Sequence, residues 1–177
     1  MKRLFFIPST ILFLVALFFM GCGYGLIGRT SNLPEDINSI FVRTLENQTT
    51  RQQINLYLTD AIVQEFVTRR RFDIASSASS ADAVLSGILI AYIVRPVEFG
   101  VDGRASRYEF TIRTNMEFKR QDSSEIIWAQ DSYVYRGDFE LTLDEGQGTI
   151  IDNEDPTIQL VSREFAQTLV VDMLEGF

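Results

Sequence analysis

The clearest pattern along the chain is an alternation of mostly apolar with polar side chains from Arg107 to Lys119. Successive side chains of a β-strand point to opposite faces, so this period of two predicts an amphipathic antiparallel strand. One face carries Tyr108, Phe110, Ile112, Thr114, Met116 and Phe118, and the other carries Arg107, Glu109, Thr111, Arg113, Asn115, Glu117 and Lys119.

Turn sequences flank this strand on both sides, with Asp102-Gly103 before it and residues 121–124 after it. Such clusters favour hairpins, and they predict neighbouring strands at 83–99 and 126–139. The segment 83–99 has few polar positions, so both of its faces are expected to be partly covered. Gly87 within it indicates a bulge or a close approach of another backbone. Shorter strands are predicted at 37–45 and 72–75.

Two segments show the helical period instead. In residues 52–70 the apolar positions recur every three or four residues, which predicts a helix capped near Thr49 or Thr50. A second helix is predicted to open at Asp155-Pro156, where aspartate can cap and proline fits the first turn. The two apolar stripes are Ile54, Leu58, Ala61, Ile62 and Phe66, and Ile158, Val161, Phe165, Leu169 and Met173.

Each amphipathic helix needs an apolar surface, and a sheet can supply one face for both. The sequence therefore predicts an α+β fold. We expect a two-layer sandwich in which two helices pack on a mostly antiparallel sheet of about four strands.

The first 23 residues have a different organisation. Lys2 and Arg3 form a positive start, residues 11–20 are apolar, and small Gly21 precedes Cys22, which is the one cysteine of the chain. This order is typical of a secretory signal, and the apolar run is shorter than the ~20 residues that a spanning helix needs. We therefore predict a signal peptide at 1–21, a lipidated N-terminus and tether at 22–35, and a single α+β domain at 36–177.

Cys22 is the predicted lipidation site, because Gly21-Cys22 resembles a bacterial lipobox, in which cleavage precedes a cysteine that carries diacylglycerol. The alternative is an ordinary buried thiol or half of an intermolecular disulfide. Gly23, in the place of an aspartate after the cysteine, resembles the pattern sorted to the outer membrane.

Composition narrows the possible chemistry. Without residues 1–21 the chain keeps 156 residues, with 14 basic against 24 acidic side chains and a net charge of −10, which disfavours nucleic acid as a partner. Histidine is absent, and Cys22 is assigned to lipid, so serine–histidine and cysteine–histidine nucleophiles and histidine-based zinc sites are excluded. We expect a binding or structural protein, neither an enzyme nor a cofactor carrier.

An acidic stretch lies between residues 141 and 156. It is predicted to be a solvated loop, since its spacing matches no EF-hand although oxygen-rich loops suit calcium. A carboxylate-based hydrolase using this stretch is a further hypothesis, but no second motif places a base or an oxyanion hole opposite it. Its acidic residues are Asp144, Glu145, Asp152, Glu154 and Asp155.

Several segments together resemble a known family, the LPS-assembly lipoproteins of the LptE family. The resemblance covers nearly the whole mature chain, and its Ala-Asp-Ala-Val-Leu-x-Gly pattern also occurs in secretion-pore and TolB-like domains. The segments are residues 21–24, residues 45–51 followed by a helix, residues 81–88, the hairpin from Gly103 to Tyr108, and the closing residues 174–177.

The resemblance implies a lipid-anchored protein on the periplasmic face of the outer membrane. It implies a plug in the lumen of a partner β-barrel, the barrel of the LPS translocon, that assists assembly of that barrel and binds lipopolysaccharide during its delivery to the outer leaflet. No cofactor is implied. The alternative is a structural or regulatory accessory lipoprotein of another envelope machine, such as a secretion pore or a cell-wall synthase.

Lipopolysaccharide carries phosphates beside acyl chains, so its site would pair cations with apolar groups. The candidates lie at the two predicted hairpins, Arg104 and Arg107 at one and Lys119 and Arg120 at the other. The alternative for each is a solvated surface charge, which is the more common role of an isolated surface cation. The basic run Arg69-Arg70-Arg71 at the end of the first helix fits the helix dipole, with an anion site as the alternative.

Overall fold

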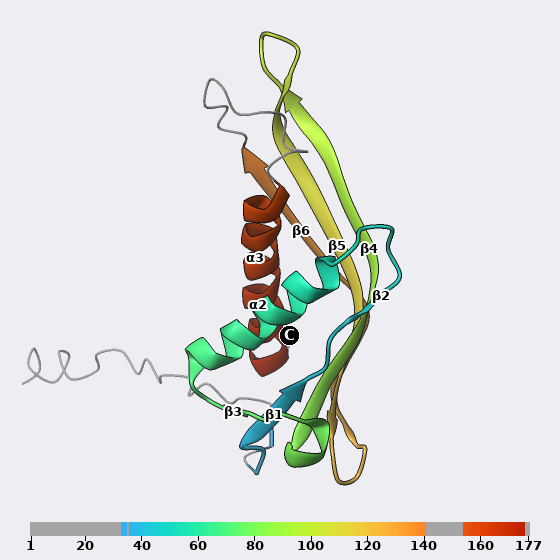
Figure 1. The fold of residues 1–177 in the computed structure, drawn as a ribbon, viewed down its shortest axis with the longest axis vertical. Coiled ribbons are helices and arrows are strands. Elements are labelled where there is room, and N and C mark those ends of the chain that lie inside the picture. The colour runs from blue at the N-terminus through green and yellow to red at the C-terminus, as the bar shows by residue number, and fades with distance from the viewer. Residues whose placement is uncertain (1–32, 35, 141–153, 176–177) are drawn as a thin grey trace, which may run out of the picture. The chain divides into compact units, whose positions relative to one another are not determined.

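The computed structural model describes residues 33–34, 36–140 and 154–175 (Figure 1). Its strands are β1 (Ser39–Val42), β2 (Glu46–Asn47), β3 (Asp73–Ile74), β4 (Ala83–Phe99), β5 (Ala105–Arg120) and β6 (Ile126–Glu140). Its helices are α2 (Ile54–Arg69) and α3 (Glu154–Glu175), with a short 3-10 turn, η1, at Ala78–Ser80.

The strands form one mixed sheet in the order β3-β1-β4-β5-β6, and β2 also pairs with β4. The pairings of β1, β2 and β3 are short and parallel, whereas β4 with β5 and β5 with β6 form long antiparallel ribbons. The α+β class is therefore confirmed. Among the described residues the sheet has six strands where about four were expected. The predicted short strand at 72–75 is present as β3, and β2 was missed because its two residues are too few to show a period.

Both helices cover the same face of the sheet and pack against each other (Figure 1). The predicted stripe of α3 is buried throughout, as are four of the five positions predicted for the first helix; Ala61 is half-buried. From the sheet, Leu85, Leu89, Ile112 and Phe118 enter the same core, each with its side chain fully buried. The apolar stripes thus supply the interface between the two layers.

The predicted cap of the first helix is wrong. The N-cap residue is Gln53, in a left-handed conformation with φ 62° and no capping hydrogen bond from its side chain. Thr49 instead closes a local turn, because its amide and its hydroxyl both donate to Asn47 Oδ1, at 2.9 and 2.7 Å. A hydroxyl that is satisfied locally competes with capping, so the helix begins five residues after Thr49.

Gly87 marks a close approach. A Cβ atom at this position would lie 2.4 Å from Met116 Sδ and 2.7 Å from the carbonyl oxygen of Asn115. The nearest irregularity of β4 lies further along, between Leu89 and Ala91. Close packing of β4 on β5 therefore requires glycine here.

Candidate functional site

The four candidate cations lie at opposite ends of β5. Arg104 and Arg107 lie at the β4–β5 hairpin, and Lys119 and Arg120 lie next to the β5–β6 turn. A strand of 16 residues spans about 50 Å at ~3.3 Å per residue. The structure therefore separates the candidates into two pairs that cannot bind the same phosphate.

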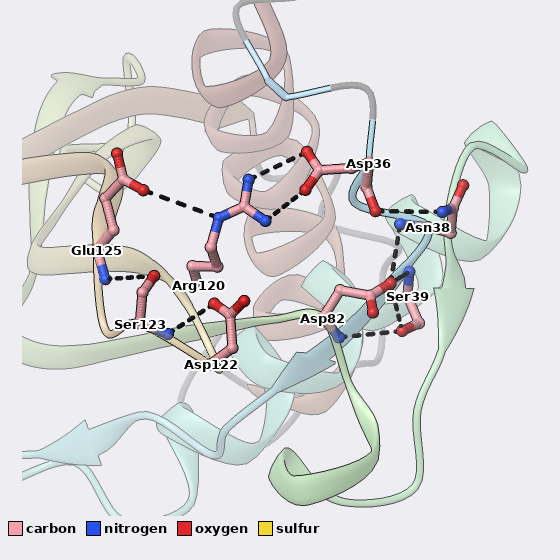
Figure 2. A network of polar contacts seen from close by, with 8 residues as sticks. All are labelled: Asp36, Asn38, Ser39, Asp82, Arg120, Asp122, Ser123 and Glu125. Carbon is pink, nitrogen blue, oxygen red and sulfur yellow. Dashed lines mark hydrogen bonds and ion pairs between the residues drawn. The ribbon is translucent and has the colours of Figure 1, made fainter.

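Arg120 is held by carboxylates (Figure 2). Its Nη1 and Nη2 donate to the two carboxylate oxygens of Asp36 at 2.5 and 3.0 Å, and its Nε lies 3.8 Å from Glu125 Oε2. The hydrogen bond from Arg120 lowers the pKa of Asp36, and the same bond raises the pKa of Arg120. A bidentate pair of this kind fixes geometry. Arg120 therefore joins the segment before β1 to the β5–β6 turn.

Asp82 forms the second part of this network (Figure 2). Its Oδ2 accepts hydrogen bonds from the backbone amides of Asn38 and Ser39, at 3.0 and 2.8 Å, and from Ser39 Oγ at 2.9 Å. The amide hydrogen bonds of Asn38 and then Ser39 lower the pKa of Asp82. This aspartate belongs to the Ala-Asp-Ala-Val-Leu pattern, and its role here is to pin the start of β1 to the start of β4.

Lys119 is also paired, since its Nζ lies 2.7 Å from Glu117 Oε2 on the same face of β5. Both side chains are about one-third exposed, at 39% for Lys119 and 36% for Glu117. The charge of Lys119 is therefore balanced by a neighbour on its own strand.

The β4–β5 hairpin has a different environment. Arg104 is 78% exposed, and its Nε lies 3.9 Å from the carboxylate of Asp102. Arg107 lies between Glu98 and Asp138, at 3.3 and 3.8 Å. Phe99, 62% exposed, and Val101, fully exposed, are close in sequence to these arginines. This hairpin therefore combines cations with uncovered apolar side chains, which is the combination expected for a phosphate that carries acyl chains.

The basic run after the first helix is accounted for by packing and pairing. Arg69 Nε lies 2.6 Å from Glu65 Oε1, Arg70 is the C-cap residue of α2, and the guanidinium of Arg71 lies 5.2 Å from the centre of the Phe72 ring. These contacts favour the structural interpretation over an anion site.

Two predictions fall outside the described residues. Cys22 precedes them, and the acidic stretch lies largely within 141–153. In the part of the chain that the structure describes, no three His, Cys, Asp or Glu side chains converge in a way that could hold a metal ion. Within that same part, no helix has the length and apolar character needed to cross a membrane.

Comparison with protein families gives a match to the LptE family, described as lipopolysaccharide-assembly, over residues 37–175. The chain belongs to the LptE family. A comparison with curated proteins finds no match. Membership supports a role in lipopolysaccharide assembly, and the LptE family is a non-catalytic accessory lipoprotein family whose members are associated with the outer membrane.

Several solved structures have a similar fold. Lipoprotein B from Nitrosomonas europaea is 13% identical, with a TM-score of 0.51 over 86% of this chain and 91% of that one. A hypothetical protein from Chlamydia trachomatis is 7% identical, with a TM-score of 0.50 over 80% of this chain and 97% of that one. At these identities the likeness shows the shared α+β fold.

Sequence reasoning missed the long-range partners of two of the candidate cations, Arg120 and Arg107. Asp36 lies 84 positions from Arg120, and Asp138 pairs with Arg107 from the next strand, so no local spacing reveals either contact. It also missed that Phe99 and Val101 are exposed. Their place beside the predicted Asp102-Gly103 turn was an available signal, because residues at hairpin tips extend away from the core.

Proposed function

We propose that this protein occupies the lumen of a partner outer-membrane β-barrel of the LPS translocon, assists assembly of that barrel, and binds lipopolysaccharide on its way to the outer leaflet. In this proposal residues 1–21 are removed, Cys22 carries the lipid, residues 22–35 are the tether, and the domain lies on the periplasmic face. Membership of the LptE family supports the role. The polar outward face of β5, described next, carries the proposal of a plug.

The face of β5 turned away from the helices carries polar side chains. Phe110, Ile112 and Phe118 point into the core, so the alternate positions point the other way. These outward positions include Arg113, which is exposed, and Asn115, whose Oδ1 accepts a hydrogen bond from the amide of Ser132 on β6 at 2.9 Å. The lumen of an outer-membrane barrel is polar, so such a face can hydrogen-bond with it.

The β4–β5 hairpin supports the lipopolysaccharide part of the proposal. Arg104 and Arg107 can offer guanidinium groups to phosphates, and Phe99 and Val101 can contact acyl chains. Arg120 is engaged in a bidentate pair and Lys119 is paired with Glu117, so a phosphate at that end would have to displace a carboxylate. Arg107 also lies between two carboxylates, those of Glu98 and Asp138, whereas Arg104 is 78% exposed. We therefore place the strongest contribution at Arg104 and weaker ones at Arg107, Lys119 and Arg120.

Photocrosslinking in intact cells tests both parts. We expect a photoreactive residue in place of Arg104 to capture lipopolysaccharide, and one in place of Arg113 to capture a barrel fragment identified by mass. A photoreactive residue in place of Leu56, an exposed position of α2 on the other layer, is the control for nonspecific capture. Capture of neither species, together with no barrel in a stoichiometric complex after gentle detergent extraction, contradicts the proposal.

A further inference from the structure

The distal hairpin, residues 93–107, is the far end of the β4–β5 ribbon and extends past both helices (Figure 1). Among the described residues nine large apolar side chains are exposed, and five of them lie within residues 93–101. Soluble domains rarely expose so dense an apolar cluster unless it contacts a partner or a membrane. The five side chains are those of Ile93, Val94, Val97, Phe99 and Val101.

The exposed side chains lie on both faces of the ribbon. Val94 pairs with Phe110, whose ring is part of the core, so Val94 lies on the helix-facing side of the sheet. Ile93 is its neighbour along the strand and therefore points to the opposite side. Their exposed fractions are 42% for Val94 and 50% for Ile93. A folded protein partner docks against one face of a ribbon, whereas a fluid phase surrounds both faces.

The tip of the distal hairpin is apolar and unshielded. Phe99 is 62% exposed, and Val101, in the turn, is fully exposed. A site for a single small molecule is concave and covers most of the surface of its ligand. Side chains that project into solvent without neighbours do not form such a site. The acyl layer of a membrane needs no concave site, because it closes around whatever enters it.

The charges of the distal hairpin are compensated by nearby partners, so the hairpin has no large excess of charge that would attract anionic headgroups. Apolar contact is therefore the main force available for binding a membrane. Deep burial of charged groups beside the tip would be costly, which limits any insertion to a shallow depth. The paired arginines are Arg95 with Glu109 at 2.8 Å, Arg104 with Asp102 at 3.9 Å, and Arg107 with Glu98 at 3.3 Å.

We propose that the distal hairpin inserts shallowly into the acyl layer of a phospholipid membrane, with Phe99 and Val101 as the inserted side chains. The proposed function gives this hairpin the acyl chains of a lipopolysaccharide molecule as its ligand. The membrane contact goes beyond that function and needs no lipopolysaccharide. It is also separate from the lipid predicted at Cys22, so it is a second point of attachment to the membrane.

The test uses the full chain reconstituted into phosphatidylcholine vesicles whose acyl chains carry bromine close to the headgroup, where it quenches nearby tryptophan. The parent has one tryptophan, Trp128, which gives the background. We expect Phe99→Trp to add fluorescence that is quenched by the brominated lipid and shifted to shorter wavelength. Leu56→Trp is the matched control, because Leu56 on α2 is 53% exposed, and we expect no quenching above the background.

A second substitution tests the chemistry of the tip. Val101→Asp places a charge at an inserted position, so adding it to the Phe99→Trp protein is expected to abolish the additional quenching while circular dichroism stays unchanged. High salt is expected to leave the quenching of the Phe99→Trp protein as it was, because apolar contact is not screened. Quenching that disappears in high salt assigns the contact to the arginines and overturns the inference.

The remaining outcomes separate this inference from the proposed function. Equal quenching in Phe99→Trp and Leu56→Trp, or none above the background in either, overturns the insertion. Quenching that requires lipopolysaccharide in the vesicles also overturns it and leaves the proposed function standing. Quenching in phospholipid alone, with no lipopolysaccharide captured at Arg104 in cells, supports the insertion and contradicts the proposed function. A photoreactive residue in place of Val101 that captures only protein in cells identifies a protein partner and overturns the membrane contact.

Discussion

The helix-covered part of the sheet and the distal hairpin, residues 93–107, share two strands but differ in what their apolar side chains contact. In the covered part Leu85 and Phe118 are fully buried under α2 and α3. In the distal hairpin Val97 and Phe99 are 48% and 62% exposed, and the hairpin extends past the helices (Figure 1). The same strands therefore contribute stability at one end and leave apolar surface available for binding at the other.

Arginines show the same contrast. Arg120, at the covered end, is 20% exposed and bidentate to Asp36. Arg104, in the distal hairpin, is 78% exposed and lies 3.9 Å from Asp102. The two side chains have the same charge and the same chemistry. Their surroundings alone therefore make Arg120 a structural contact and leave Arg104 accessible to a ligand.

The largest expected effect comes from truncating a ring in each region. Phe118→Ala removes a fully buried ring and is expected to lower the free energy of unfolding by about 3–5 kcal/mol. Phe99→Ala is expected to change it by no more than about 0.5 kcal/mol, because this ring is 62% exposed. Urea unfolding followed by circular dichroism measures both. Equal losses would show that the distal hairpin is packed as tightly as the covered part.

Adding a methyl group at a glycine gives the next effect. Gly87→Ala places Cβ against Met116 Sδ and the Asn115 carbonyl, and is expected to cost about 1–3 kcal/mol of folding stability. Gly100→Ala in the distal hairpin is the control, since its nearest neighbour is the flexible carboxylate of Asp102 at 3.0 Å. Urea midpoints compare the two. A Gly87→Ala protein as stable as the parent would contradict the close approach of β4 and β5.

Removing one hydroxyl between the layers gives a smaller effect. Tyr133 donates to Asp172 Oδ2 at 2.7 Å, so Tyr133→Phe is expected to cost about 1–2 kcal/mol. The control is Tyr108→Phe, because the stacking of Tyr108 on Phe139 needs only the ring, and its expected change is within about 0.5 kcal/mol. Equal stability of Tyr133→Phe and the parent would show that this hydrogen bond contributes nothing to the contact of β6 with α3.

The same hydroxyl predicts a dependence on alkaline pH. Burial and the hydrogen bond to Asp172 raise the pKa of Tyr133, and burial and Glu164 raise that of Tyr135. The folded protein then holds protons that the unfolded chain releases, so stability is full below pH 10 and falls as pH rises above it. Unfolding midpoints from pH 8 to 11 measure this fall, and we expect it to be shallower in Tyr133→Phe. An equal fall in the parent and in Tyr133→Phe would show that the Tyr133 hydroxyl is not the source of the pH dependence.

The smallest expected effect separates the two arginines. Arg120→Ala is expected to lower the melting temperature slightly, because Asp36 loses its bidentate partner, and Arg104→Ala is expected to leave it unchanged. The pKa of Asp36 is lowered by Arg120, so the stabilising effect of this pair is present above the ordinary aspartate pKa of 3.8 and is lost as pH falls below it. Melting curves at pH 7 and pH 3 compare the variants. A difference between them that persists unchanged at pH 3 would contradict this origin.

Periodicity predicted those parts of the fold in which one face of an element is buried. The stripes of α3 and β5 were predicted correctly because burial of one face imposes a regular spacing on the sequence. The helix cap was predicted wrongly, because Thr49 makes a competing local hydrogen bond to Asn47. The pairing of β2 with β4 was not predicted, because it involves only two residues of β2. The candidate site was predicted as residue types at two hairpins. The carboxylates beside Arg104 and Lys119 lie two positions away in the sequence, whereas Asp36 and Asp138 reach Arg120 and Arg107 from other segments.

The sequence by itself determined the element types, the α+β class and the family, since these depend on local spacing and on motifs read in order. Only the tertiary structure decided that Arg120 is joined to Asp36, that the distal hairpin extends beyond the helices, and that α2 and α3 line an open groove. The physical reason is that pairing, exposure and enclosure are set by which distant segments come together, and folding alone specifies those neighbours.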